Sequence, residues 1–283
     1  MKKGLIGLVI VSFVLVFTAG AMAAEFSWSG DASFGIEGTS DGAAGDFFGS
    51  GDLYLNATAT SGAWGVGVEL GKENGDPVYI DPFITYTAEA FTLTLDDSID
   101  NGVFDTEVPG IPGNPGLKLE IPMEAFTPYV IVNNVEDGDE VTYNFAGGAD
   151  FTTGAMGLGV TLNSNGEDES TSYGVKATYS MDALSLTGEY GVLSPKDGDS
   201  GSGYYAEVGY SIAGGGSFTF HYSGADENIA VGDEGYTKWS EIYGEFSYPI
   251  AESVDFTVDV TSTNAEELDE SITTYEAKVG FSF

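Results

Sequence analysis

The sequence predicts an all-β protein folded as one closed, antiparallel, membrane-spanning barrel, and three observations support this fold class. Segments throughout the chain after residue 23 alternate apolar and polar residues with a period of two, as strands with one apolar face do. The connections between these segments are alternately short and long. The last ten residues, "TYEAKVGFSF", continue the alternation to an aromatic residue with no polar tail.

Residues 1–23 predict a cleaved secretory signal peptide. A basic start, Met1 to Lys3, precedes an almost wholly apolar run over 5–18 and the small residues Ala21-Met22-Ala23. The alternative is a retained anchor, but the run is shorter than the roughly 20 residues that a spanning helix needs. We therefore expect export, cleavage after Ala23 and a single domain over 24–283. The chain has no cysteine, which excludes a disulfide scaffold and a lipid-modified N-terminal cysteine.

The alternation predicts sixteen strands of about 10 residues each. Clear examples are Trp64, Val66, Val68 and Leu70 in one segment and Tyr275, Ala277, Val279, Phe281 and Phe283 in the last. Seven short connections are expected, at 61–62, 89–90, 123–125, 153–154, 181–182, 213–215 and 250–253. Eight long, acidic connections rich in Gly, Asn and Ser are expected, at 39–50, 71–76, 97–115, 134–140, 164–171, 193–203, 224–235 and 262–271. Fifteen connections join sixteen strands, so both chain ends lie on the side of the short turns.

The alternation of short and long connections favours a barrel over a soluble β-sandwich, which also has alternating strands. In a sandwich the apolar faces form a core, and nothing requires every second connection to be short. An even number of strands with tight turns at one end and longer loops at the other is typical of outer-membrane barrels. Apolar-phase aromatics such as Trp64 and Phe218 lie near the short turns, and others such as Tyr190 lie near the long loops, which predicts two interfacial bands.

The inward phase of the predicted strands is polar, and a barrel of about 16 strands encloses a water-filled channel. Carboxylates outnumber lysines on this face, which predicts a lumen that concentrates cations and repels anions. The candidate pore-lining residues are Asp31, Asp52, Glu69, Asp81, Lys118, Glu120, Lys176, Glu189, Glu207, Glu241, Glu245, Asp255, Asp259, Glu276 and Lys278.

The composition is strongly acidic, with 45 Asp and Glu against 8 Lys and Arg and a formal net charge of −37. Removal of Lys2 and Lys3 with the signal peptide leaves 6 − 45 = −39. This balance excludes nucleic acid as a natural partner, because phosphate binding needs Lys and Arg. The acidic stretches 136–140 and 197–203 could hold Ca²⁺ loosely, but neither matches an EF-hand loop. We expect solvated loops, no dedicated metal site and no cofactor.

The signal peptide, the sixteen alternating segments and the aromatic end "GFSF" together resemble the general porins of Gram-negative outer membranes. The resemblance implies a homotrimer in outer-membrane lipid, and a C-terminal strand, with Phe281 and Phe283, that is read by the barrel assembly machinery. It also implies that the third loop folds into the barrel and narrows it.

The third loop is the longest predicted connection. Carried over from the porin resemblance, its constriction carboxylates would be Asp100, Asp105 and Glu107. Prolines in the same loop lower the entropy lost when a loop becomes ordered; they are Pro109, Pro112 and Pro115. The alternative is an ordinary exposed loop. General porins also carry arginines on the wall opposite this loop, and this chain contains none, so the implied transverse field does not carry over.

The function expected from these features is passive diffusion of ions, cations above all, and small hydrophilic solutes. A sugar-selective channel is an alternative, because several aromatic residues fall in the inward phase: Tyr54, Tyr79, Tyr129, Tyr205, Trp239 and Tyr243. A structural or adhesive barrel is a second alternative. We do not expect an enzyme, because His221 is the single histidine and no Gly-x-Ser-x-Gly nucleophile motif is present.

Overall fold

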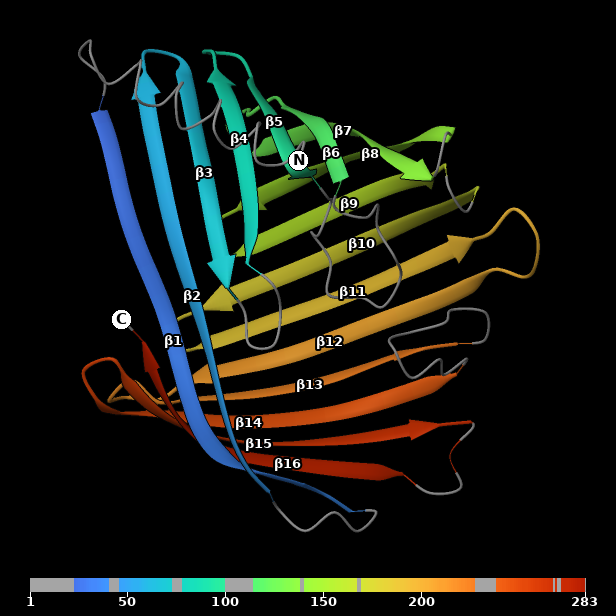
Figure 1. Ribbon diagram of the computed structural model, residues 1–283. Coiled ribbons are helices and arrows are strands. Elements are labelled where there is room, and N and C mark those ends of the chain that lie inside the picture. The colour runs from blue at the N-terminus through green and yellow to red at the C-terminus, as the bar shows by residue number, and fades with distance from the viewer. Residues whose placement is uncertain are drawn as a thin grey trace.

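The computed structural model describes residues 23–40, 46–72, 78–99, 114–137, 140–166, 169–226, 238–266, 268 and 271–282. Within these ranges sixteen β-strands run around one barrel (Figure 1). The strands are β1 (Ala23–Thr39), β2 (Asp46–Ser61), β3 (Trp64–Lys72), β4 (Tyr79–Thr87), β5 (Thr92–Ile99), β6 (Asn114–Glu120), β7 (Phe126–Asp137), β8 (Glu140–Thr153), β9 (Met156–Asn165), β10 (Ser170–Met181), β11 (Leu184–Ser194), β12 (Gly201–Ser211), β13 (Ser217–Ala225), β14 (Trp239–Ala251), β15 (Val254–Ala265) and β16 (Ile272–Ser282).

The sheet is closed by the first and last strands. Each strand pairs with its sequence neighbours in an antiparallel ladder, and β1 pairs with β16, so the described strands leave no free edge. Ala32 lies opposite Phe281 and Phe34 opposite Val279 in this last ladder. The predicted barrel and its sixteen strands are confirmed, and the sandwich alternative is wrong.

Burial alternates along the strands in the sense opposite to that of a soluble protein. On β9 the apolar residues Leu158 and Leu162 are 50% and 62% exposed, whereas the polar residues Thr161 and Asn163 on the other face are 7% and 4% exposed. Most of the large apolar side chains that point outward around the barrel are similarly exposed. A hydrocarbon solvent accounts for this arrangement, because an apolar outer face then meets lipid and a polar face lines the interior.

The turns at one end are tight, as predicted. Four of them consist of two residues, at 62–63, 154–155, 182–183 and 252–253. Each includes one residue with a positive φ angle, namely Gly62, Gly154, Asp182 or Ser253. Glycine adopts this conformation without strain, and aspartate tolerates it better than most residues. The short turns thus follow from local sequence.

Some connections predicted to be long are shorter in the structure. The ladder between β7 and β8 continues to Asp137 opposite Glu140, so strand pairing covers most of the expected loop at 134–140. Likewise Asn165 pairs with Ser170 across the expected loop at 164–171. A strand with polar residues on both faces shows no alternation of apolar and polar residues, so periodicity does not predict it. Its backbone groups still form the hydrogen bonds of the ladder. The strands also vary more in length than expected, from 7 residues in β6 to 17 in β1.

Several predicted features lie outside the described residues. They include the signal segment before Ala23, the loop carboxylates Asp100, Asp105 and Glu107, and the terminal Phe283. The described bounds nevertheless place the longest gap between consecutive strands after β5, where the third loop was predicted. No helix in the described ranges is long and apolar enough to cross a membrane.

Candidate functional site in the barrel interior

Carboxylates lie directly opposite one another on the inner face of the wall, the face opposite the exposed apolar side chains. Glu245 on β14 pairs in register with Asp259 on β15, Asp259 pairs with Glu276 on β16, and Glu276 pairs with Glu37 on β1. These four residues form what we call the acidic row. Like charges in directly opposed positions repel each other. The row therefore generates a strong local negative potential toward the interior.

Two further acid pairs continue this pattern around the wall. Asp31 on β1 lies opposite Asp52 on β2, and Glu69 on β3 lies opposite Asp81 on β4. The strands from β14 through the β1–β16 closure to β4 thus form an arc of inward carboxylates. Lys278 is the lysine on this arc, and its Nζ lies 2.6 Å from a carboxylate oxygen of Glu276.

The lysines on the opposite part of the wall are also paired. Lys118 Nζ lies 2.9 Å from Glu120 on the same strand, and Lys176 Nζ lies 2.8 Å from Glu189 on the neighbouring strand. The Glu189 side chain is 0% exposed, so this ion pair is largely shielded from water. All three lysines predicted to line the pore are therefore neutralised by adjacent carboxylates, and the acids of the arc remain in excess.

Tyrosines hold several of the carboxylates. Tyr205 Oη donates to Glu207 at 2.5 Å, Tyr243 Oη to Glu245 at 2.7 Å, and Tyr79 Oη to Glu69 at 2.8 Å. The first two pairs are two residues apart on one strand, so the tyrosine and the carboxylate share the inner face. Such charge-assisted hydrogen bonds fix the direction of the carboxylate.

An aromatic row crosses three neighbouring strands beside these pairs. The ring centroids of Tyr205 and His221 are 5.2 Å apart, and those of His221 and Tyr243 are 4.6 Å apart with the planes nearly parallel at 13°. His221 Nε2 also lies 3.4 Å from an oxygen of Glu241, which accepts a second contact from Thr263 Oγ1 at 3.2 Å. Aromatic and acidic side chains thus alternate on the inner wall of β12–β14.

The inner wall of β7–β10 carries, besides Lys176, a group of buried and uncharged polar side chains. Asn163 Nδ2 donates to Ser172 Oγ at 2.9 Å, and Asn144 Oδ1 accepts from the backbone nitrogen of Gly166 at 2.9 Å. Asn144 and Asn163 are 0% and 4% exposed. This part of the wall is therefore shielded from water although its side chains are polar.

The end of β5 reaches toward the same wall. Ile99 is buried with Tyr129 and Ile131 of β7 and Ala146 of β8, and its carbonyl oxygen accepts from Asn133 Nδ2 at 2.7 Å. Neighbouring strands are about 4.8 Å apart, so a residue of β5 contacts β7 and β8 only if the chain leaves the wall toward the interior. The register shift between Asp96 and Ile99 marks where it does so.

Solved structures of bacterial porins are similar to this chain in fold. An anion-selective porin from Comamonas acidovorans matches with a TM-score of 0.70 at 12% sequence identity, covering 92% of this chain and 100% of that chain. The chain has the porin fold. A variant of the Rh. blastica porin matches with a TM-score of 0.66 at 15% identity, covering 92% and 100%. OpdQ from Pseudomonas aeruginosa matches with 0.56 at 11%, covering 92% and 98%. No protein-family model matches the sequence, and a search of curated proteins finds no match.

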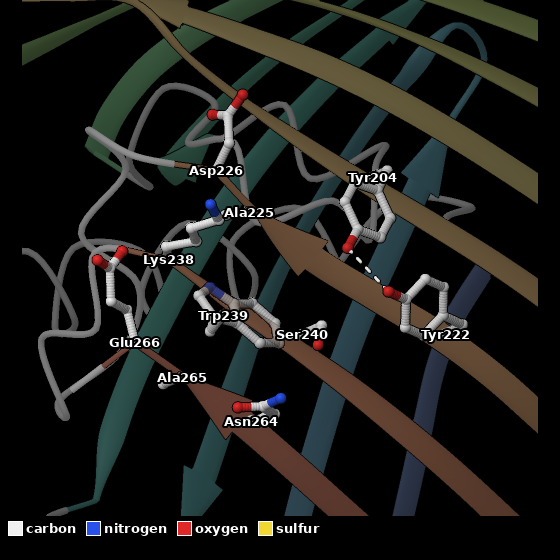
Figure 2. A pocket seen from close by; sticks show the side chains of 10 residues that line it. All are labelled: Tyr204, Tyr222, Ala225, Asp226, Lys238, Trp239, Ser240, Asn264, Ala265 and Glu266. Carbon is white, nitrogen blue, oxygen red and sulfur yellow. Dashed lines mark hydrogen bonds between the residues drawn. The ribbon is translucent and has the colours of Figure 1, made fainter. Parts of the chain in front are cut away.

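The porin-like barrel has a pocket of about 500 Å³ at the long-loop ends of β12–β15 (Figure 2). Tyr204 Oη donates to Tyr222 Oη at 3.2 Å at one side, and Lys238 lies between Asp226 and Glu266 at the other. Asp226 is held by the backbone nitrogen and hydroxyl of Ser202 at 2.5 and 2.7 Å. The pocket lies at the rim, away from the acidic row.

The predicted lining residues occupy the strand phase opposite to that of the exposed apolar side chains, which is the phase that we propose lines a channel. Ion pairs join Lys118 with Glu120, Lys176 with Glu189, and Lys278 with Glu276, and the strand register places Glu69 opposite Asp81. The predicted inward aromatics do not form one track. Tyr129 and Trp239 are buried in separate clusters, and Tyr79 is bonded to Glu69, several strands from the row of Tyr205 and Tyr243. Among the described residues no group of three or more His, Cys, Asp or Glu could hold a metal ion.

The tyrosine–glutamate pairs, the aromatic row and the buried polar side chains of β7–β10 were not predicted from the sequence. The pairs leave a visible signal, since "YAE" at 205–207 and "YGE" at 243–245 place both side chains on one face of a strand. The aromatic row depends on the registers of three strands, and burial of Asn144 depends on what covers it. Neither of these can be read from periodicity.

Proposed function

We propose that this chain forms a water-filled diffusion channel in an outer membrane and prefers cations over anions. The observation that carries the proposal is the acidic row, Glu245, Asp259, Glu276 and Glu37, on the polar inner face of a sixteen-stranded barrel. Barrels of this size hold an aqueous channel, and rings of carboxylates select cations.

The outer-membrane location is supported by the signal segment at 1–23 and by the exposed apolar outer face. An exported chain without a disulfide scaffold, whose apolar side chains point outward from a closed sheet, has lipid as its natural surroundings. Assembly belongs to the same proposal: Phe281 on the strand that closes the sheet, together with the last residue of the sequence, Phe283, serves as the assembly signal, and three chains associate.

The porin fold by itself does not decide between selectivity for cations and selectivity for anions. The proposed cation preference therefore follows from this chain's own charges. The Comamonas acidovorans porin with a similar structure is described as anion-selective. Here the three inner lysines are each paired with a glutamate, and carboxylates outnumber the lysine on the arc from β14 to β4. A cation entering the channel is stabilised along this arc, and an anion is repelled.

A constriction by the third loop is part of the proposal, with Asp100, Asp105 and Glu107 as its carboxylates. The position of Ile99 supports it, since the residue before the loop packs on the inner faces of β7 and β8. An inward loop would also cover the buried polar wall around Asn144. The tyrosine–glutamate pairs do not favour the sugar-selective alternative, because those hydroxyls are already engaged.

Solute flux into proteoliposomes tests the open channel directly. Vesicles containing the refolded chain are placed in iso-osmotic solutions of neutral sugars of increasing size, and swelling is followed by light scattering. The proposal predicts fast swelling with monosaccharides and progressively slower swelling with larger oligosaccharides. A verified folded barrel that admits none of these sugars would contradict an open channel and favour a structural or adhesive role.

A further inference from the structure

We infer that the aromatic row of Tyr205, His221 and Tyr243 is a subsite for organic cations, and specifically for quaternary or aromatic ammonium groups. The inference rests on the proposed channel and names a solute class for it. Such cations are recognised by aromatic rings combined with carboxylates, since the ring supplies an apolar, electron-rich surface and the carboxylate supplies the charge.

The rings form a continuous surface on the inner wall. They come from β12, β13 and β14, with centroid separations of 5.2 Å and 4.6 Å, and His221 lies directly opposite both Glu207 and Tyr243 in the ladders. Beyond Tyr243 the next inner residue at this level is Thr261, a short side chain that is partly exposed. One side of the row is therefore open to a bound group.

Carboxylates flank the row on both sides along the strand axis. Glu241 precedes Tyr243 on β14 and contacts His221 Nε2 at 3.4 Å, while Glu245 follows it and accepts from its hydroxyl at 2.7 Å. Glu207 occupies the equivalent place beside Tyr205. The ion pairs of Lys118, Lys176 and Lys278 involve other carboxylates, so these three acids are not neutralised by them.

A cation fits this surface better than a sugar. A neutral sugar needs several hydrogen-bond donors and acceptors around its ring, and the two tyrosine hydroxyls are committed to Glu207 and Glu245. An organic cation needs no hydrogen-bond donor from the protein and gains from every unneutralised carboxylate nearby. A small inorganic cation gains the charge but makes no use of the rings.

The test is block of the potassium current by phenyltrimethylammonium in planar bilayers at pH 8. Wild type is compared with Tyr243→Leu, which removes the ring, and with Tyr243→Phe, which keeps the ring and loses only the hydroxyl. We expect concentration-dependent block in wild type and in Y243F, and about five-fold weaker block in Y243L. The ratio of potassium to chloride permeability is measured in all three proteins, because both variants lose the hydrogen bond from Tyr243 to Glu245 of the acidic row. Y243F therefore separates loss of the ring from loss of that hydrogen bond.

Equal block of wild type and Y243L by phenyltrimethylammonium would overturn the subsite. Block of wild type by glucose that is as strong as block by phenyltrimethylammonium would also overturn it, and so would equal block of wild type and Y243L by tetramethylammonium. Glu241→Gln provides an independent variant that keeps side-chain volume, and its block should also weaken. If the refolded chain does not conduct, titration calorimetry of phenyltrimethylammonium into the same full chain in detergent separates the two proposals. Binding that is lost in Y243L then supports the subsite while the channel fails, and absent binding overturns the subsite.

Discussion

Asp259 on β15 lies directly opposite Glu276 on β16, inside a closed barrel. Glu245 and Glu37 extend the pair on its two sides, and Lys278 contacts only Glu276 of this row. Such a row of like charges opposes folding, so its presence on a wall that could carry serine or threonine indicates a functional demand. We interpret the acidic row as a path for cations. A cation that passes along it also reduces the repulsion between the carboxylates.

Neutralising the row should reduce cation selectivity. The double substitution Asp259→Asn with Glu276→Gln removes two charges with little change of shape, and we expect the permeability ratio of potassium to chloride to fall by about two-fold or more. Asp182→Asn removes one charge in a short turn, at a residue with positive φ that asparagine also tolerates, and serves as the control. An unchanged reversal potential in the double variant would mean that selectivity is set elsewhere.

Arginine substitutions at two adjacent positions of β10 can test which face of the barrel wall meets lipid and which faces the interior. Val175 on the outer face of β10 is 46% exposed, and Lys176 next to it points inward and pairs with Glu189. Val175→Arg should destabilise the barrel by about 2–4 kcal/mol, because an arginine in mid-strand would face hydrocarbon. Lys176→Arg should cost much less, since the ion pair can re-form. Urea unfolding in lipid vesicles measures both, and a harmless V175R would refute a lipid-facing surface.

The Lys176–Glu189 pair should be required for stability. Its carboxylate is fully shielded, so Lys176→Met removes the cation that lies 2.8 Å from it and leaves a buried charge. We expect a loss of about 3 kcal/mol in the free energy of unfolding, with most of it restored when Glu189→Gln is added to the same variant. If Lys176→Met alone were as stable as wild type, water or another group would have to stabilise the charge of the Glu189 carboxylate.

Ile99 should anchor the start of the third loop. Ile99→Ala removes the side chain that packs on Tyr129, Ile131 and Ala146, which costs about 2–4 kcal/mol of local packing. We expect a noisier and larger single-channel current, together with faster proteolysis between β5 and β6. Ile84→Ala on the outer face of β4 is the matched control, since Ile84 is 38% exposed and is not part of the buried cluster around Ile99. Identical current noise in I99A and wild type would contradict an anchored constriction.

Much of the fold could be predicted because a barrel in lipid obeys a period of two along nearly its whole length. Segments such as Trp64 to Leu70 show one apolar and one polar face, and tight turns follow from residues such as Gly62. Strand ends were predicted less well. Asp137 and Glu140 pair in a ladder although neither their composition nor their pattern indicates a strand.

The site could be predicted only in part. The alternation of apolar and polar residues shows which face of the sheet a side chain lies on, but not which side chains of other strands lie next to it. The sequence indicates that Glu245, Asp259 and Glu276 point inward, yet their direct opposition depends on the registers of three strands. The contact of Ile99 with β7 and β8 depends on a register shift and a departure from the wall. Long-range relations of this kind have no local signal.

The most direct test of the central claim is the reversal potential of single channels of the refolded chain across a planar bilayer with a KCl gradient. The acidic row predicts stable, open channels with a reversal potential of the sign given by potassium permeability exceeding that of chloride. A reversal potential of the opposite sign, or no stable conductance from a verified folded barrel, would contradict the account.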